Sequence, residues 1–422
     1  LVEYAIVLDG REIPLSDIWF TTTRSQVDGA EVVLFESRTG SGRRIALEYW
    51  FPPAGYSTRV KATLQGFDPG SGSGRFEIRF PAGIADLERD HKVDQQGAAG
   101  IALMGRSLIK HGRGRGPWSQ MENGVVQWGG VRSKYFLAAA IPDGAPDGEI
   151  AMSRGQNGRI AATVRLPLSL ERTSLYEFTL FGGPMRHGVL ESYGVGLERA
   201  VDSGWRVFVP LVDLLRKFFV FMYGLLPNYG IVIIILSILS RVVFYPLTRK
   251  SMESMKQMQL LKPEMDRLNE KYKNDPQKRN QAILELYKKN KVNPAGGCLP
   301  ILVQMPVFIA LYNLLNSAIE LRKAPFGLWI QDLSAPDRVG SIAGFPIHIL
   351  PLVMAATMLW QQKLTPTDPR QATLMYIMPI VMTIFFYPMP SGLVLYWTVS
   401  NLAAIAQQLM MNRSAERRPA VA

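Results

Sequence analysis

The stretch "SILSRVVFYPLTRKS", residues 237–251, begins inside an apolar run and ends in basic residues. Its first arginine, Arg241, lies eight residues before Arg249, which is about 12 Å along a helix. That depth falls within the hydrocarbon region of a bilayer, where an arginine costs roughly 2.5–3.5 kcal/mol. The stretch therefore indicates one of two arrangements: a hydrated cavity among membrane helices, or an arginine side chain that reaches out to the headgroups.

The positive charge of the chain is concentrated in its second half. Residues 1–200 hold 23 Lys/Arg and 22 Asp/Glu, whereas residues 201–422 hold 24 and 13. The second half also carries nearly all the long apolar runs, so its basic character is typical of a membrane protein rather than of a domain that binds DNA. The single cysteine, Cys298, excludes an intrachain disulfide.

Residues 1–200 are predicted to form an all-β domain. Short alternating runs at 74–80, 159–168 and 175–183 are separated by turn-rich stretches. A two-sheet sandwich is the expected architecture, because one large open sheet would leave an apolar face in water. Residues 201–227, which follow, are apolar but interrupted by charges, and this pattern favours an amphipathic helix lying in the membrane interface.

Residues 228–412 are predicted to form a membrane core of five helices, each close to the roughly 20 residues that a 30 Å hydrocarbon core requires. The predicted spans cover about 228–248, 297–318, 346–363, 371–388 and 391–411. None contains an Asp or Glu that would pair with Arg241. Proton-coupled transport usually needs a titratable acid in the membrane, so the sequence argues against that activity.

Residues 249–292 hold 12 Lys/Arg, and their apolar residues recur at spacings of three and four, which is typical of amphipathic helices. We expect one long helix, a break at "NDP" (274–276) and a second helix, together forming a hairpin outside the membrane. The positive-inside bias places this hairpin in the cytoplasm, with the basic tail 413–422, and puts the β domain outside. An outside N-terminal domain in turn predicts an anchor helix upstream of Leu1.

The methionines of the hairpin have two interpretations. They pack its two helices together, or they form an adaptable surface that receives varied hydrophobic substrates. The residues concerned are Met252, Met255, Met258 and Met265.

Other polar residues on the predicted spans favour a polar recess around Arg241. A lone membrane amide more commonly forms a helix–helix hydrogen bond, but several amides together with an unpaired arginine fit a hydrated recess better. The candidates are Gln304, Asn313, Asn316, Thr383, Asn401 and Gln407. The sequence has neither a phosphate-binding loop nor a His/Cys cluster, so we expect no cofactor, no metal and no enzymatic activity.

Several stretches closely resemble the YidC family of membrane protein insertases. They are "VNPAGGCLPILVQMPVFIALYNLL" (292–315), "ELRKAPFGLWIQDLSAPD" (320–337) and "PSGLVLYWTVSNL" (390–402). Upstream, "SRVVFYPLTRKSMESMKQMQLLKPEM" (240–265) is similar to the family's first core helix and cytoplasmic hairpin. In the outer domain, "NGVVQWGGVRSKYFLAAAIP" (123–142) resembles the Gram-negative type of the family. The resemblance extends over essentially the whole chain.

The resemblance implies an insertase and chaperone of the bacterial inner membrane. The fold class would be α+β multidomain: an all-β periplasmic supersandwich, then five transmembrane helices with a cytoplasmic helical hairpin. Arg241 would be the single positive charge in a hydrophilic groove open to the cytoplasm and the lipid. Further residues implied to line the groove are Met305, Phe308, Phe385, Tyr396 and Trp397. The implied partners are nascent membrane proteins, the Sec translocon, the ribosome through a short tail, and anionic lipids.

Two other interpretations remain open. A small-solute channel or transporter would use Arg241 as a filter, but it needs a continuous pore and the outer halves of the spans are strongly apolar. A sugar-processing outer domain on a passive anchor would account for neither Arg241 nor the hairpin. In the connector between the second and third spans, "PFGLWIQDL" (325–333) predicts an interfacial helix with Trp329 at headgroup level. The loop 337–345 is longer than the resemblance leads us to expect.

Overall fold

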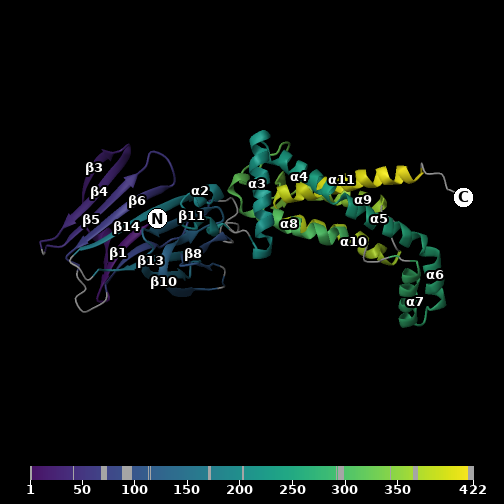
Figure 1. The fold of residues 1–422 in the computed structure, drawn as a ribbon, viewed down its shortest axis with the longest axis horizontal. Helices are drawn as coiled ribbons and strands as arrows, with labels where there is room; N and C mark the ends of the chain where they lie inside the picture. The colour runs from purple at the N-terminus through teal and green to yellow at the C-terminus, as the bar shows by residue number, and fades with distance from the viewer. Residues whose placement is uncertain are drawn as a thin grey trace. The chain divides into compact units, whose positions relative to one another are not determined.

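The chain divides into two compact units, Leu1–Asp202 and Ser203–Ala422. The computed structural model describes residues 2–416 except 41, 68–73, 88–96, 113, 115, 170–172, 202–203, 291, 293–298, 343 and 365–368. Figure 1 shows the long strands in the first unit and nearly all the helices in the second. Each unit has a hydrophobic core of its own.

The first unit contains an antiparallel sheet of 14 strands. Along this sheet the strand order is β2-β1-β7-β13-β12-β10-β11-β14-β6-β5-β4-β3, with β8 and β9 branching from β10. The strands are β1 (Glu3–Leu8), β2 (Arg11–Pro14), β3 (Thr21–Val27), β4 (Ala30–Arg38), β5 (Arg44–Phe51), β6 (Ser57–Gln65), β7 (Gly74–Phe80), β8 (Ala99–Met104), β9 (Ser107–His111), β10 (Trp118–Arg132), β11 (Phe136–Pro142), β12 (Asp147–Arg154), β13 (Ile160–Pro167) and β14 (Thr173–Pro184). The prediction of an all-β N-terminal domain is confirmed.

Strand β10 makes the sheet fold over into two layers. Its first half pairs with β12, its second half pairs with β8 and β11, and the register shifts between Val126 and Trp128. Side chains from the two layers meet in one core, where the rings of Phe76 on β7 and Tyr176 on β14 stack with centroids 5.0 Å apart. Aromatic stacking of this kind joins the layers of a sandwich.

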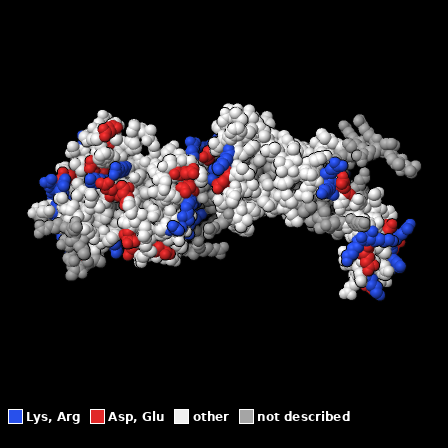
Figure 2. Space-filling view, viewed as in Figure 1, with Lys and Arg blue, Asp and Glu red and all other residues white. Residues whose placement is uncertain are grey.

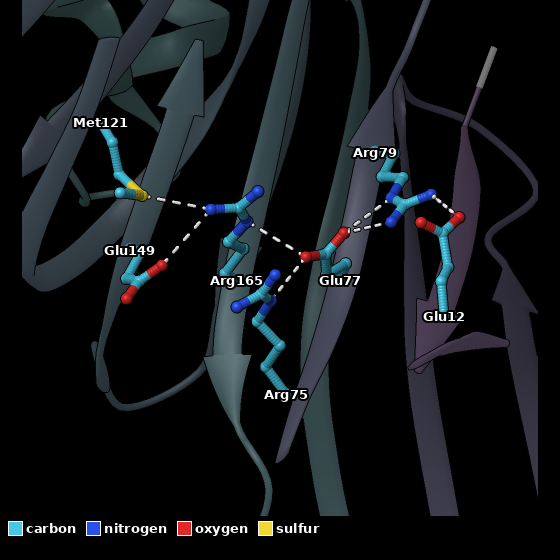
Figure 3. Close-up of polar contacts among 7 residues, drawn as sticks. All are labelled: Glu12, Arg75, Glu77, Arg79, Met121, Glu149 and Arg165. Atoms are coloured by element: carbon cyan, nitrogen blue, oxygen red, sulfur yellow. Dashed lines mark hydrogen bonds and ion pairs between the residues drawn. The ribbon is translucent and has the colours of Figure 1, made fainter. Parts of the chain in front are cut away.

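The outer face of β7 carries a cluster of charges centred on Glu77 (Figure 3). Phe76, Ile78 and Phe80 alternate with the charged residues and point into the core. The Glu77 carboxylate is only 2% exposed, because arginines surround it: Arg75 Nε lies 2.7 Å away, Arg79 Nε 2.7 Å and Arg165 Nε 3.1 Å. Burial by itself raises the pKa of Glu77, but the hydrogen bonds from Arg79 and Arg75 and the charges of Arg79 and Arg165 outweigh it, so the pKa is lowered.

The second unit is mostly helical. Its helices are α3 (Val209–Leu225), α4 (Tyr229–Val243), α5 (Tyr245–Leu260), α6 (Lys262–Lys271), α7 (Pro276–Lys289), α8 (Leu299–Ser317), α9 (Ile349–Leu364), α10 (Pro369–Phe386) and α11 (Ser391–Glu416). Its short 3-10 turns are η3 (Arg206–Phe208) and η5 (Ile319–Leu321). The first unit contains the 3-10 turns η1 (Leu15–Asp17) and η2 (Leu197–Ala200) and one short helix, α2 (His187–Glu191), which packs on its strands. Helix α3 packs against α8 and α4 through Val212, Leu215 and Phe219.

The prediction of one span over 228–248 is wrong in one respect: these residues belong to two helices, α4 and α5. The Asn228 side chain accepts hydrogen bonds from the amides of Gly230 and Ile231 and so begins α4. Helix α4 ends at Val243, and α5 leaves at an angle of 58°. Pro246 explains the break, because it has no N–H for a carbonyl one turn earlier and its ring displaces that carbonyl.

The basic segment departs from its prediction for the same reason. The single helix expected before residue 274 is divided at Leu261 into α5 and α6, and Pro263 lies in the first turn of α6. Helix α7 begins after Asp275, whose carboxylate accepts a hydrogen bond from the Lys278 amide at 3.1 Å. Helices α6 and α7 lie side by side (Figure 1), and this α6–α7 pair has a small core of its own.

The small core of the α6–α7 pair is expected to determine the stability of the pair. It contains three buried residues, Met265, Ile283 and Leu286, so Ile283→Ala should destabilise the pair by about 2 kcal/mol through the cavity it leaves. Limited proteolysis between α6 and α7 should therefore become clearly faster. The control is the neighbouring Leu284→Ala, because Leu284 is 54% exposed. Equal cleavage rates in both variants would contradict the packing described here.

Among the described residues, no helix taken singly combines the length and the apolarity needed to cross a membrane; Tyr229–Val243 and Tyr245–Ser254 do so only as a bent pair. Charged side chains are sparse over the middle of the helical unit on the face drawn in Figure 2, whereas Lys and Arg gather over α6 and α7.

Candidate functional site

Arg241 lies in the last turn of α4, just before the break at Phe244. Its side chain is half-buried, and its buried Nε atom has no hydrogen-bond partner among the described residues. Those residues provide no ion pair for it either. A guanidinium presents five N–H donors and a permanent charge, so this group is available to water or to a visiting molecule.

Tyr396 brings three helices together next to Arg241. It is fully buried on α11, and its hydroxyl lies 3.4 Å from Ser240 Oγ of α4 and 3.3 Å from Gln304 Nε2 of α8. The phenol is also close enough to Arg241 for an electrostatic interaction. Three of the predicted site residues, Arg241, Gln304 and Tyr396, therefore lie in one polar cluster.

Helix α11 continues this polar surface. Asn401 Nδ2 donates to Thr357 Oγ1 of α9 at 3.3 Å, so it has the helix–helix role that is common for a membrane amide. Three other buried atoms of α11 have no partner among the described residues: Trp397 Nε1, Ser400 Oγ and Gln407 Nε2. An unsatisfied buried polar group costs about 1–3 kcal/mol, so bound water is expected at these atoms.

Aromatic rings from α8, α10 and α11 pack beside the polar cluster. The ring centroids of Phe308 and Trp397 are 5.4 Å apart, and Phe386 lies 5.7 Å from the first and 5.2 Å from the second. Phe385 extends the group outward with 51% of its surface exposed, and Met305 is 41% exposed. Apolar side chains thus remain available beside the polar cluster.

Three of the predicted site residues make no hydrogen bond with the described residues of the polar cluster around Arg241. The Asn313 side chain contacts Gly204, about 13 Å along α8 from Gln304 at 1.5 Å per residue. Thr383 Oγ1 donates to the Pro379 carbonyl of its own helix at 2.7 Å. Asn316 makes no hydrogen bond with any described residue.

The hairpin methionines differ in their surroundings. Met265 is buried in the α6–α7 pair, where Tyr287 Oη lies 3.4 Å from its sulfur. Met252 and Met258 are half-buried on α5, and the side chain of Met255 lies outside the described residues. Packing between the two helices thus accounts for Met265. The interpretation of the methionines as a surface that receives hydrophobic substrates applies to Met252 and Met258 on α5.

Sequence reasoning missed four polar residues of this region: Ser237, Ser240, Thr357 and Ser400. Ser237 Oγ donates to the Ile233 carbonyl at 2.7 Å, and both α4 serines are buried against α11. Their spacing of three residues places them on one helix face. That spacing is visible in the stretch 237–251, and it could have indicated that Ser237 and Ser240 share a polar helix face.

A second cluster lies where α9 begins. The buried Asp337 carboxylate accepts hydrogen bonds from the Leu350 amide at 2.7 Å and from Trp329 Nε1 at 2.9 Å. Its charge therefore stabilises the first turn of α9. The Asp337 carbonyl is also 2.6 Å from His348 Nδ1, so these contacts hold the connector against the helix.

The interfacial helix predicted at 325–333 is wrong. Gly327 and Ile330 form a β-bridge that closes a turn, and Leu328 has a φ of 54°. A left-handed residue of this kind ends right-handed helical geometry. Trp329 is instead held by Asp337.

Comparison with known proteins identifies the family. The model for the YidC periplasmic domain matches residues 6–212, and the model for the 60Kd inner membrane protein matches residues 221–418. "Membrane protein insertase YidC" of Syntrophus aciditrophicus is 45% identical over 69% of this chain and 53% of its own length. The protein of the same name from Citrifermentans bemidjiense is 35% identical over 97% of this chain and 76% of its own length.

Among solved structures, an active YidC insertase with its first transmembrane domain resolved is 19% identical, with a TM-score of 0.44, over 96% of this chain and 82% of that chain. The chain spans from about half to three quarters of the length of the two relatives named above.

The two family models cover the β unit and the helical unit in turn, and they define an inner membrane protein with a periplasmic domain. The chain belongs to the YidC family. The resemblance noted in the sequence is confirmed.

Proposed function

We propose that this protein inserts transmembrane segments of nascent membrane proteins into the bacterial inner membrane and acts there as their chaperone. The relatives' name supports this activity. The observation that carries it is Arg241, a half-buried cation whose Nε has no partner among the described residues. It lies beside buried polar atoms of α11, on a helix that packs into the apolar core of the helical unit. A cation without a counter-charge in such surroundings is costly unless water or a substrate reaches it.

The proposed site is a hydrated groove lined by α4, α8 and α11. Water at Trp397 Nε1, Ser400 Oγ and Gln407 Nε2 would shelter the polar tail of a substrate, and Arg241 would attract its acidic or carbonyl groups. Met305, Phe308 and Phe385 would guide the apolar segment toward lipid. Burial of that segment, at about 0.8 kcal/mol per CH₂, supplies the driving force without a nucleotide. Gln304 and Tyr396 hold the groove wall together.

The proposed topology follows the distribution of basic residues. The β unit is periplasmic and α3 lies in the interface, whereas the end of α5, helices α6 and α7 and the tail 413–422 are cytoplasmic. The membrane helices are α4 with the start of α5, α8, α9, α10 and α11. Met252 and Met258 on α5 would meet an arriving substrate. The proposed partners are the Sec translocon, the ribosome and anionic lipids, the last attracted by the Lys and Arg of the hairpin.

The test uses liposomes that contain only this protein, with an N-terminal anchor helix joined to Leu1. A single-spanning substrate with an acidic outer tail is added, and its protection from external protease is measured against empty liposomes. We expect protection to depend on the protein. Efflux of small anions from the same vesicles is measured in parallel. Anion efflux without insertion would support the channel interpretation and would contradict the proposed function.

A further inference from the structure

A small β-hairpin in the connector before α9 presents an exposed apolar pair. Strands β15 (Gly340–Ile342) and β16 (Phe345–Ile347) pair so that Ile342 lies directly opposite Phe345. Residues opposite each other in a hairpin project from the same face. These two side chains are 70% and 78% exposed, which is unusual for large apolar groups that are held in a fixed structure.

Contacts with Tyr387 hold the hairpin in place. The Tyr387 hydroxyl donates to the Pro346 carbonyl at 2.6 Å, and the Val339 amide donates to the Ile347 carbonyl at 3.1 Å. The rings of Tyr387 and His348 meet with centroids 4.6 Å apart. The hairpin is therefore attached to the end of α10 and to the start of α9, and its apolar pair is left exposed.

Charge and length place this hairpin at the edge of the apolar region. No Asp, Glu, Lys or Arg occurs from Val339 to Gln362, so the uncharged run begins ten residues before α9. Helix α9 has 16 residues, or about 24 Å at 1.5 Å per residue, which is short of a hydrocarbon core of about 30 Å. A strand of three residues adds about 10 Å, so helix and hairpin laid end to end would exceed the hydrocarbon core by a few ångström and place the hairpin in the interface.

We propose that the β15–β16 hairpin is a membrane-interface wedge that inserts Ile342 and Phe345 between the headgroups and acyl chains of the outer leaflet. The inference rests on the membrane placement proposed above. The interface suits a two-stranded hairpin, because its outer N–H and C=O groups still reach water there, which the hydrocarbon core would not allow. Trp329 and Tyr387 lie at the same end of the helices, as aromatic residues of the interface do.

Lipid fits this surface better than a protein partner does. The exposed pair carries no hydrogen-bonding or charged group that would specify a partner. On α10, to whose end the hairpin is attached, Ile380 and Ile384 are 62% and 70% exposed, so the neighbouring helix also presents an apolar surface. One continuous lipid environment would cover both.

The test places a single nitroxide on the complete chain, with Cys298→Ala removing the native thiol, in vesicles of phosphatidylethanolamine and phosphatidylglycerol. The labelled variants are I342C and F345C, which replace exposed side chains and so leave packing intact. The collision rates of each label with oxygen and with a water-soluble nickel chelate are compared. Ser341→Cys reports the opposite face, Ile384→Cys is the lipid reference, and Thr23→Cys on exposed β3 is the water reference.

At both hairpin positions we expect a several-fold higher ratio of oxygen to nickel collisions than at Thr23, approaching that at Ile384, with a lower ratio at Ser341. Ratios equal to that at Thr23 would put the hairpin in water and overturn the wedge. Low collision rates with both reagents would indicate a protein contact and also overturn it. A water-like ratio at Ile384 itself would show that the membrane placement, and with it the proposed function, is wrong.

Discussion

Arg241→Ala is expected to lower the insertion of a substrate with an acidic outer tail by at least tenfold. A carboxylate about 5 Å from the guanidinium gains about 3 kcal/mol at an effective dielectric constant near 20. Water in the groove reduces this gain, and about 1.4 kcal/mol already corresponds to a factor of ten in rate. The measurement is the initial rate of protease protection in liposomes that contain the protein and no translocon.

Arg241→Lys is expected to restore most of the rate, because it keeps the charge and loses only the fork of donors. The matched control is Arg249→Ala: this arginine pairs with Glu253 at 3.0 Å, both side chains are 54% exposed, and its loss should change insertion little. The insertion rate of a substrate with a neutral tail should change little in any of the three variants. If Arg241→Ala inserts the acidic substrate as fast as the wild type, the groove acts through hydration alone.

Glu77→Gln is expected to destabilise the β unit by about 3 kcal/mol, since removing one partner of a buried charge cluster leaves the others uncompensated. The cost lies at the low end of such changes, because Arg75, Arg79 and Arg165 are 40%, 22% and 23% exposed and reach water in part. The measurement is pulse proteolysis of the complete chain in urea. Glu31→Gln is the control: its partner Arg24 is 3.7 Å away and both side chains are exposed, so no measurable change is expected.

The same variant has a distinct pH dependence. The folded pKa of Glu77 is lowered from 4.5, so its stabilisation is present above that value and is lost as the pH falls through the folded pKa. The stability difference between wild type and Glu77→Gln should therefore be constant above about pH 5 and should shrink in more acidic solution. A difference that stays constant down to pH 3 would mean that Glu77 contributes by shape rather than by charge.

Much of the fold was predictable because local patterns report burial. Alternating runs such as 74–80 became β7, and the three- and four-residue spacing of apolar residues became α5, α6 and α7. The errors fell at two prolines, Pro246 and Pro263, whose rings interrupt a helix, and at the turn formed by Gly327 and Leu328, which have positive φ values. The prolines were visible in the sequence, but the angle of 58° and the left-handed Leu328 were not.

The sequence by itself determined that an arginine interrupts an apolar run and that the predicted spans carry no acidic residue, since composition is a property of the chain segment alone. Only the tertiary structure decided which polar groups meet it. Tyr396 joins Ser240 and Gln304, Asn401 pairs with Thr357, and Asn313 lies against Gly204. The physical reason is that helical period assigns a residue to a face, whereas the partner of that face depends on how the helices pack.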